Sequence, residues 1–304
     1  MSGPRQESPF GRYHPAVNFL YFALVIVYSV VLLHPFCLGI SLCCAFAYSL
    51  RLNGRRAWRF NLLYLLPLLL LCALLNPAFN HEGNTVLFYL YNGRPVTAES
   101  VYYGLASAAM LVTAICWFSC YNLVMTTDKF VYLFGRVIPS LSLVLSLALR
   151  MIPRFREQTK VVINAQRCLG RASGEGKRLS RAKQGLRVFS ILMTWALENA
   201  IQTADSMRAR GYGLPGRTTF SIYRWERRDW LALSLILLAG AYVLLGLLCG
   251  GVSYSYYPSL QLGGFGLYSC SVFGAYLLLC ALPLGIELLE QLAWRRAAKL
   301  PEDC

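Results

Sequence analysis

Acidic residues and histidines are scarce in this chain. Its 304 residues hold 14 aspartates and glutamates against 29 lysines and arginines, with three histidines. The aspartates are isolated in the sequence, at Asp128, Asp205, Asp229 and Asp303. A magnesium-dependent enzyme acting on diphosphate lipids needs paired carboxylates, so this shortage argues against that class.

Metal-site and disulfide patterns are also missing. No Cys-x-x-Cys pair occurs, and His14, His34 and His81 lie far apart. Most of the 11 cysteines lie in apolar runs, where a free cysteine behaves as a small hydrophobe. The chain also lacks a Walker A glycine loop, a His-Glu-x-x-His motif and a Gly-x-Ser-x-Gly elbow. We therefore expect no metal site, no cofactor and no catalytic activity of its own.

What the chain has in abundance is apolar sequence. Hydrophobic residues make up 57% and charged residues 14%, and the mean hydropathy is +0.48. This composition lies outside the usual range of soluble domains and predicts a polytopic membrane protein. In a membrane protein, lysines and arginines beside the spans set the orientation. We therefore interpret the net charge of +15 mainly as a sign of topology, and nucleic-acid binding is the weaker explanation. We expect no nucleic-acid partner.

Six apolar runs predict an all-α polytopic membrane protein with about six transmembrane helices. They cover residues 17–33, 36–50, 58–75, 100–124, 229–249 and 267–289. The first two are slightly shorter than the ~20 residues of an ordinary span. Only His34-Pro35 separates them, which favours a tight helical hairpin. The first run lacks a small-x-small cleavage pattern, so we interpret it as a retained anchor rather than a signal peptide.

Basic residues in the connections set the expected topology. Four arginines follow the second run within residues 51–59, and basic residues also occupy both ends of the chain. By the positive-inside rule these clusters lie in the cytoplasm. An even number of spans then puts both termini on that side.

A small β-hairpin is expected in the connection between the third and fourth runs, on the outer side. Residues 85–91 and 94–97 are rich in β-branched and aromatic residues. They flank Asn92-Gly93, the dipeptide that favours a type I′ hairpin turn.

The chain accordingly divides into three parts. Residues 1–125 form an N-terminal membrane region with four spans, residues 126–228 an inserted cytoplasmic helical domain, and residues 229–304 a C-terminal membrane region with two spans. From residue 150 to residue 228 there are seventeen basic and five acidic residues, which disfavours translocation. The apolar run at 130–149 is interpreted as an interfacial or bundle-packed helix, with a re-entrant segment as the alternative.

Two helices are expected in the rest of the inserted domain. The first covers residues 153–170 and begins at its proline, residues 171–185 form a polar loop, and an amphipathic helix covers residues 186–210. Glu198 is the one acid in the apolar stretch of that helix. In a membrane span it would be a candidate functional residue, whereas on an amphipathic helix it is a polar-face residue beside Gln202. We favour the second interpretation.

The second of these helices ends in an arginine between two of the smallest residues. Arg210 sits at the helix C-terminus, where the macrodipole favours a cation, and Gly211 is the residue expected just past the end. Those effects explain one arginine and one glycine. They do not explain why Ala209 and Gly211 both remove bulk around a guanidinium that can make bidentate contacts, which favours a docking surface.

Several segments together resemble one known family, the transmembrane T component of energy-coupling factor transporters, which are importers of the ATP-binding cassette class. The segments that carry the resemblance are Leu75-Asn76-Pro77, Thr85-Val86-Leu87-Phe88-Tyr89, Ile138-Pro139-Ser140, Ala148-Leu149-Arg150-Met151-Ile152-Pro153-Arg154-Phe155, Ala165-Gln166-Arg167, Thr194-Trp195-Ala196-Leu197-Glu198-Asn199 and Ser206-Met207-Arg208-Ala209-Arg210-Gly211-Tyr212-Gly213. They cover most of the chain from Leu75 to Arg228.

The resemblance implies a non-catalytic subunit in the bacterial cell membrane. Such a subunit couples ATP hydrolysis by two partner ATPases to the reorientation of a separate, small substrate-binding membrane subunit. The cargo would be a vitamin or a metal ion, chosen by that other subunit. Two short arginine-bearing helix ends are expected to sit in grooves on the two ATPases.

The second helix end matches the family's small-Arg-small triplet as Ala209-Arg210-Gly211. Arg208, beside it, and Glu198, three turns earlier, are supporting residues in this assignment.

The first helix end departs from the family pattern. The expected site is Gln166-Arg167-Cys168, yet aligning Gly170 as the terminal glycine puts Leu169 at the arginine position. Either Arg167 or Arg171 is then left to supply the charge. Arg167 is favoured because the small Cys168 follows it.

Two other classes of function stay open at this point. One is a membrane scaffold whose basic domain binds anionic membrane lipid, at about 1 kcal/mol per basic residue near the surface. The other is a self-contained secondary transporter or membrane enzyme. That class needs charges or broken helices at mid-membrane, and Glu198 is the single ambiguous case.

Overall fold

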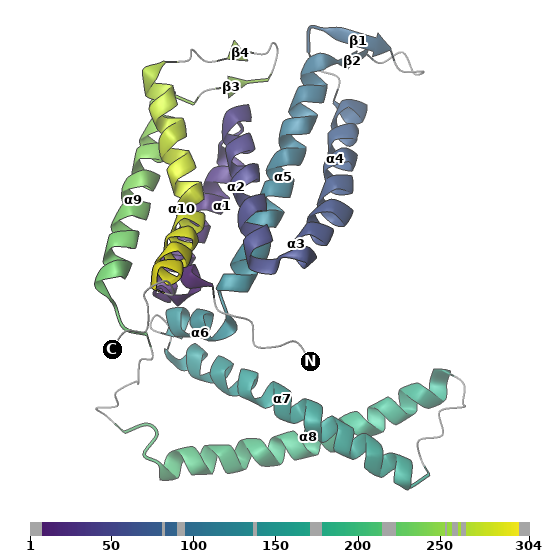
Figure 1. Ribbon diagram of the computed structural model, residues 1–304. Helices are drawn as coiled ribbons and strands as arrows, with labels where there is room; N and C mark the ends of the chain where they lie inside the picture. The colour runs from purple at the N-terminus through teal and green to yellow at the C-terminus, as the bar shows by residue number, and fades with distance from the viewer. Residues whose placement is uncertain are drawn as a thin grey trace. The chain divides into compact units, whose positions relative to one another are not determined.

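A computed structural model describes residues 8–80, 83–89, 95–135, 139–170, 178–214, 223–252, 254–256, 261–262 and 266–297 of the chain (Figure 1). The chain forms two compact units. The first comprises Met1–Phe130 with Tyr223–Cys304, and the second comprises Val131–Ile222.

The first unit is built from apolar helices. Its elements are the short 3-10 helix η1 (Pro9–Arg12), α1 (Pro15–Val31), α2 (Pro35–Asn53), α3 (Arg55–Phe60), the π-helical turn η2 (Asn61–Leu65), α4 (Leu66–Phe79), α5 (Ala98–Val124), α9 (Arg227–Leu248) and α10 (Leu267–Ala297). Because α3, η2 and α4 follow one another without a gap, residues 57–79 form one long apolar helix.

Among the described residues, five helices are long and apolar enough to cross a membrane. They are Pro35–Asn53, Ala57–Phe79, Ala98–Val124, Arg227–Leu248 and Leu267–Trp294. The one expected span not among these five is the first in the sequence. It corresponds to α1, which is apolar but has only 17 residues. The all-α polytopic membrane class is confirmed.

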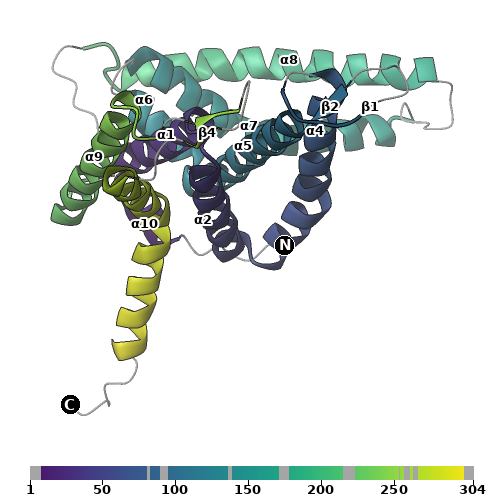
Figure 2. The same cartoon turned by 90° about the horizontal axis from the view of Figure 1, so that it is seen from above.

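Helix α5 is the centre of the first unit. It packs against α1, α2 and α4, and it lies between α2 and α4 in both views (Figures 1 and 2). Trp117 of α5 is fully buried, and its ring makes edge contacts with Tyr21 and Phe22 of α1 at 6.2 and 6.3 Å. Its Nε1 donates to the Ser41 hydroxyl of α2 at 3.0 Å. Close packing plus a satisfied polar group is how helices associate in lipid.

The helix ends of this unit are tied by buried polar side chains. Lys129 donates to the carbonyl of Gly11 at 2.6 Å and to that of Val124, at the end of α5, at 3.1 Å. Asp229 accepts from the backbone N–H of His14 at 3.2 Å and from that of Glu226 at 3.0 Å, which caps α9. These bonds join the start of α1 to the start of α9.

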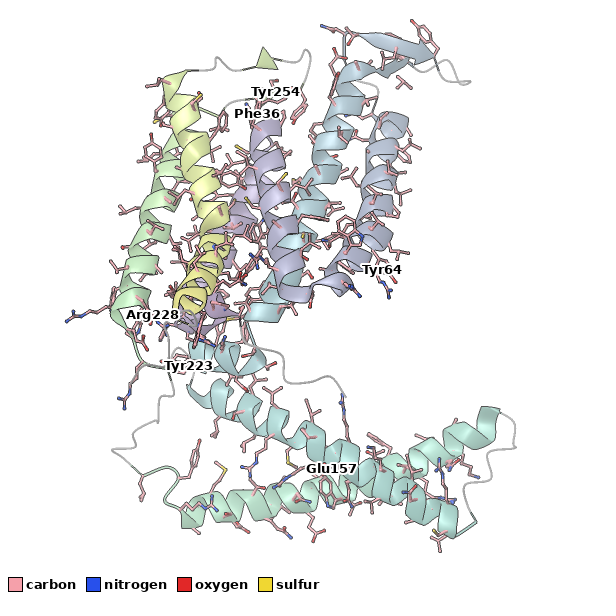
Figure 3. All side chains as sticks on the ribbon, in the orientation of Figure 1. Phe36, Tyr64, Glu157, Tyr223, Arg228 and Tyr254 are labelled. Atoms are coloured by element: carbon pink, nitrogen blue, oxygen red, sulfur yellow. The ribbon has the colours of Figure 1, made fainter. Side chains whose placement is uncertain are left out.

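Charged side chains border the same corner. Arg228, labelled in Figure 3 at the start of α9, pairs with Glu226 at 2.9 Å and lies over the ring of Tyr13 at 5.3 Å. The His14 ring stacks on Trp225 at 4.0 Å. The return of the chain into the first unit is therefore held by ion pairing and ring stacking as well as by the cap.

The predicted β-hairpin is present. Strands β1 (Val86–Tyr89) and β2 (Pro95–Thr97) pair antiparallel, with an irregularity between Val86 and Phe88. The buried Glu99 accepts from the Thr85 hydroxyl at 2.7 Å and anchors the hairpin to α5. The turn dipeptide Asn92-Gly93 lies outside the described residues.

A second short ribbon joins α9 to α10. Strands β3 (Tyr254–Ser255) and β4 (Gln261–Leu262) pair antiparallel. Two residues on each side are too few to give a periodic signal in the sequence, so this ribbon was not predicted.

The second unit contains α7 (Pro139–Cys168) and α8 (Arg178–Ala209), preceded by α6 (Thr127–Gly135), which starts in the first unit. The predicted boundaries were wrong at two points. Helix α7 begins at Pro139 and carries Pro153 in its interior. Proline removes one backbone hydrogen bond and crowds the preceding turn, but the helical pattern continues on both sides of it.

Helix α8 also begins earlier than the predicted residue 186. It starts at Arg178, so much of the expected loop at 171–185 is helical. Arginine, lysine, alanine, leucine and glutamine are good helix formers, and one interior glycine, Gly185, costs only about 1 kcal/mol. The run at 130–149 is divided between α6 and α7, and none of the candidate spans among the described residues includes it.

The contact between α4 and α5 depends on the absence of a side chain at Gly104. A Cβ there would lie 2.9 Å from the Ala73 carbonyl oxygen and 3.0 Å from the Asn76 Cβ. We expect Gly104→Leu to lower the free energy of unfolding by about 1–3 kcal/mol, because a backbone oxygen cannot move aside. Gly274→Leu in α10 is the matched control, since a Cβ there meets nothing within 4 Å. Thermal unfolding in detergent measures both, and equal midpoints would contradict the packing argument.

Candidate functional site

The second unit is a crossed pair of helices. Phe155 of α7 meets Trp195 of α8 edge to face, with ring centroids 5.4 Å apart and an interplanar angle of 83°. Val162 and Val188 are also buried. From this crossing the helices diverge, and their C-terminal ends lie at opposite ends of the unit (Figures 1 and 2). Each end is therefore the tip of a single helix.

The tip of α8 closes with two backbone hydrogen bonds. The Gly211 N–H donates to the Arg208 carbonyl at 3.0 Å, and the Tyr212 N–H donates to the Met207 carbonyl at 3.0 Å. This pair of bonds is a Schellman motif, and Gly211 has the positive φ of 78° that the motif requires. Ala209 and Arg210 are exposed beside it. The glycine thus stops the helix and leaves Arg210 as its last residue before the turn.

The tip of α7 closes in the same way as far as the described residues extend. The Gly170 N–H donates to the Arg167 carbonyl at 2.9 Å, and Gly170 has a φ of 67°. Gly170 therefore occupies the position of Gly211. By this geometry Leu169 is the counterpart of Arg210, and Arg167 is the counterpart of Arg208.

The side chains at the α7 tip differ in exposure. Arg167, Cys168 and Leu169 are exposed, and Leu169 is 63% exposed although it is apolar. Gln166 is buried, and its Oε1 has no hydrogen-bond partner among the described residues. Arg171, the alternative source of charge, lies outside the described residues.

Glu198 lies on an exposed face of α8. Its Oε1 accepts from Gln202 Nε2 at 3.4 Å, one turn along the helix. This is the polar-face position described from the sequence, and the contact is a weak surface one.

A second apolar face of α8 was not predicted from the sequence. Leu186, Phe189, Met193, Leu197 and Ile201 are all exposed, from 44% to 67%. Their spacing of three or four residues gives one continuous stripe. This three- and four-residue spacing can be seen in the sequence. The apolar residues of α8 that pack toward α7 have the same spacing, however, so only the contact between the two helices shows which residues are buried and which are exposed.

Comparison with known proteins supports a family assignment. Residues 6–220 match the model of the family described as cobalt transport protein, CbiQ. The chain belongs to this family. A relative from Listeria innocua, named energy-coupling factor transporter transmembrane protein EcfT, is 30% identical over 256 residues, which cover 76% of this chain and 95% of the relative.

Other relatives match over a shorter stretch. Proteins of the same name from Lacticaseibacillus paracasei and Lactobacillus helveticus are 37% and 35% identical over 110 and 105 residues. These matches cover 36% and 34% of this chain, and the chain spans only 42% and 38% of those two relatives. This CbiQ-family chain is therefore a multi-pass membrane protein of a transport family.

The α8 tip depends on the glycine at its end. We expect Gly211→Val to destabilise the last turn by about 1–2 kcal/mol, because a β-branched residue resists positive φ. Hydrogen exchange at the amides of Arg210 and Tyr212 should speed up about tenfold. Gly185→Ala, near the start of the same helix with nothing within 4 Å of the added Cβ, is the control and should leave exchange at these two amides unchanged. Unchanged exchange in Gly211→Val would refute the role of the cap.

Proposed function

We propose that this chain is the coupling subunit of an energy-coupling factor importer. In this proposal it transmits the movement of two partner ATPases to a separate membrane subunit that binds a vitamin or a metal ion. The observation that carries the proposal is the α8 tip, where a Schellman turn presents Arg210 between two residues without bulk. The family membership agrees with this role.

The geometry suits the transmission of force. Helix α8 has 32 residues, which corresponds to a rod about 48 Å long at 1.5 Å per residue. Movement at one end of a rod supported by the α7 crossing displaces the other end. The chain itself needs no catalytic group for this, and hydrolysis belongs to the ATPases. The topology that suits this role has the second unit and both termini in the cytoplasm.

The two tips would meet their ATPases with different chemistry. At the α8 tip the terminal side chain is a guanidinium, which can bind an acidic or carbonyl-lined groove bidentately. At the α7 tip the equivalent side chain is Leu169, with Arg167 two residues earlier. We propose that Arg167 supplies the charge there while Leu169 fills an apolar part of the groove.

The apolar stripe of α8 is the proposed contact for the substrate-binding subunit. Five exposed large side chains in one row exceed what scattered surface hydrophobes explain. A membrane-embedded partner with an apolar surface would cover them.

The first test of the proposal replaces the terminal arginine. We expect Arg210→Glu to insert and fold normally but to retain partner ATPases at least thirtyfold less tightly, since losing one member of a buried charge pair costs about 2–5 kcal/mol. Co-purification and uptake by the reconstituted complex measure the effect. Arg187→Glu makes an equal charge change on the same helix and is the control. It should keep both normal ATPase binding and normal uptake.

Full uptake by Arg210→Glu would overturn the coupling role. A wild-type chain that co-purifies with lipid and no ATPase would favour a lipid-binding scaffold instead.

The second test addresses the α7 tip. We expect Arg167→Ala to lower uptake more than Arg171→Ala, and Leu169→Glu to lower it most, because it places an acid at the counterpart of Arg210. The reverse order for the two arginines would move the charged contact to Arg171. Normal uptake by Leu169→Glu would show that the terminal position of this tip makes no contact.

A further inference from the structure

A hollow in the first unit has no role in the coupling proposal. It measures about 270 Å³ and lies between α2 and α4, with α5 closing its inner side. Its walls are apolar, and several of them, including Leu62 and Leu66, are half exposed, so the hollow opens at the surface of the helix bundle. Helix α4 contacts α5 along its length and has no buried residue of its own, which leaves the opening uncovered within the described residues.

One polar side chain lines this apolar hollow. Asn61 is 4% exposed, and both its Nδ2 and its Oδ1 lack a hydrogen-bond partner among the described residues. A buried amide without partners is unfavourable, because it has lost its hydrogen bonds to water and gained none in return. Asn61 also begins the π-helical turn η2, and such turns concentrate at functional sites. The amide therefore points to a ligand that has a polar group next to an apolar chain.

The edge of the hollow on the α3 side is basic. Arg55 and Arg59 are exposed, and neither forms an ion pair among the described residues. Arg55 precedes Leu62 of the wall by seven residues and Arg59 by three, which places them on the same side of the helix, two turns and one turn away. Trp58 is 51% exposed, and its ring contacts Phe46 of the wall at 5.8 Å. Tryptophan and arginine together mark the level of lipid head groups.

We propose that this hollow binds one anionic glycerophospholipid. An acyl chain occupies the space between α2 and α4, and Asn61 Nδ2 donates a hydrogen bond to the ester carbonyl at its end. The phosphate then lies at Arg55 and Arg59, with Trp58 beside the glycerol. Figure 3 shows the side chains of this corner, where Tyr64 is labelled on η2. The proposal is independent of the coupling role, since every residue in it belongs to the first unit.

The chemistry favours a lipid over a protein helix as the occupant. A neighbouring helix would bury the leucines of α4, but it would offer a side chain to Asn61 only by chance and would leave the two arginines without an anion. A phospholipid supplies the acyl chain, the carbonyl and the phosphate in the order in which the wall, Asn61 and the arginines occur along the helix.

Native mass spectrometry of the full chain, with any subunits that co-purify, tests the proposal. The probes are dioleoyl phosphatidylglycerol and dioleoyl phosphatidylcholine added to delipidated protein. We expect one tightly held phosphatidylglycerol. Asn61→Leu should weaken it about fivefold, and Arg55→Gln with Arg59→Gln about thirtyfold, so that it binds no better than phosphatidylcholine. Arg150→Gln with Arg154→Gln, on α7, removes the same charge elsewhere and should change nothing.

A variant that fills the hollow provides the second arm. Leu69→Trp should abolish the tight site, whereas Leu70→Trp, on the exposed side of α4, should keep it. If Leu69→Trp fails to fold, Asn61→Leu and the arginine pair still decide the question. Glycerol phosphate at millimolar concentration should not compete, because it lacks the acyl chain.

Three results would overturn the proposal. They are equal retention of both lipids by the wild-type chain, unchanged binding in Asn61→Leu and the arginine pair, and a cross-link from Cys43, at the edge of the hollow, to a second polypeptide in the assembled complex.

Discussion

Backbone groups at a helix end must find hydrogen-bond partners, and apolar surroundings make that requirement strict. In the first unit, side chains meet it at the starts of α1, α2, α5 and α9 and at the end of α5. The ring Nδ1 of His34 accepts from the Phe36 N–H at 3.3 Å, and burial lowers the pKa of this histidine, which keeps the accepting nitrogen unprotonated. Lys129 satisfies the last carbonyl of α5, and Asp229 caps α9. These caps define where each helix begins and ends, and so which residues face one another.

At the ends of α7 and α8 in the second unit, glycine meets the same requirement, as it also does at the end of α9 in the first. Gly170 and Gly211 turn the chain back on itself so that the helix carbonyls are paired by backbone N–H groups. Because no side chain is spent on the cap, the neighbouring positions are free to face a partner. Arg210 and Leu169 occupy equivalent positions just before these glycine turns. One side chain is charged and the other is apolar, so the two tips suit two different contacts.

Two buried side-chain amides lie beside exposed surfaces of the described residues. Asn61 and Gln166 are buried with amide oxygens that have no partner among the described residues. Asn61 lines an open apolar hollow and points to a lipid, whereas Gln166 lies one residue before Arg167 at the α7 tip. The two amides belong to different units. Asn61 lies beside the open hollow, and Gln166 lies beside the exposed side chains of the α7 tip.

The sequence by itself determined the membrane class, the positions of the apolar helices, the β-hairpin and the glycine stop after Arg210, because hydropathy, alternation and glycine act over a few neighbouring residues. It misplaced the starts of α7 and α8, since a proline and a basic stretch are local signals that a continuing helix overrides. Only the tertiary structure decided which of two apolar faces of α8 packs on α7, that Leu169 rather than Arg167 is the counterpart of Arg210, and that Asn61 borders a hollow. The packed face of α8 and the hollow depend on contacts between distant residues, which no local pattern encodes. The place of Leu169 depends on where α7 stops, and the sequence left that open because Gly170 and the triplet around Arg167 predict different ends.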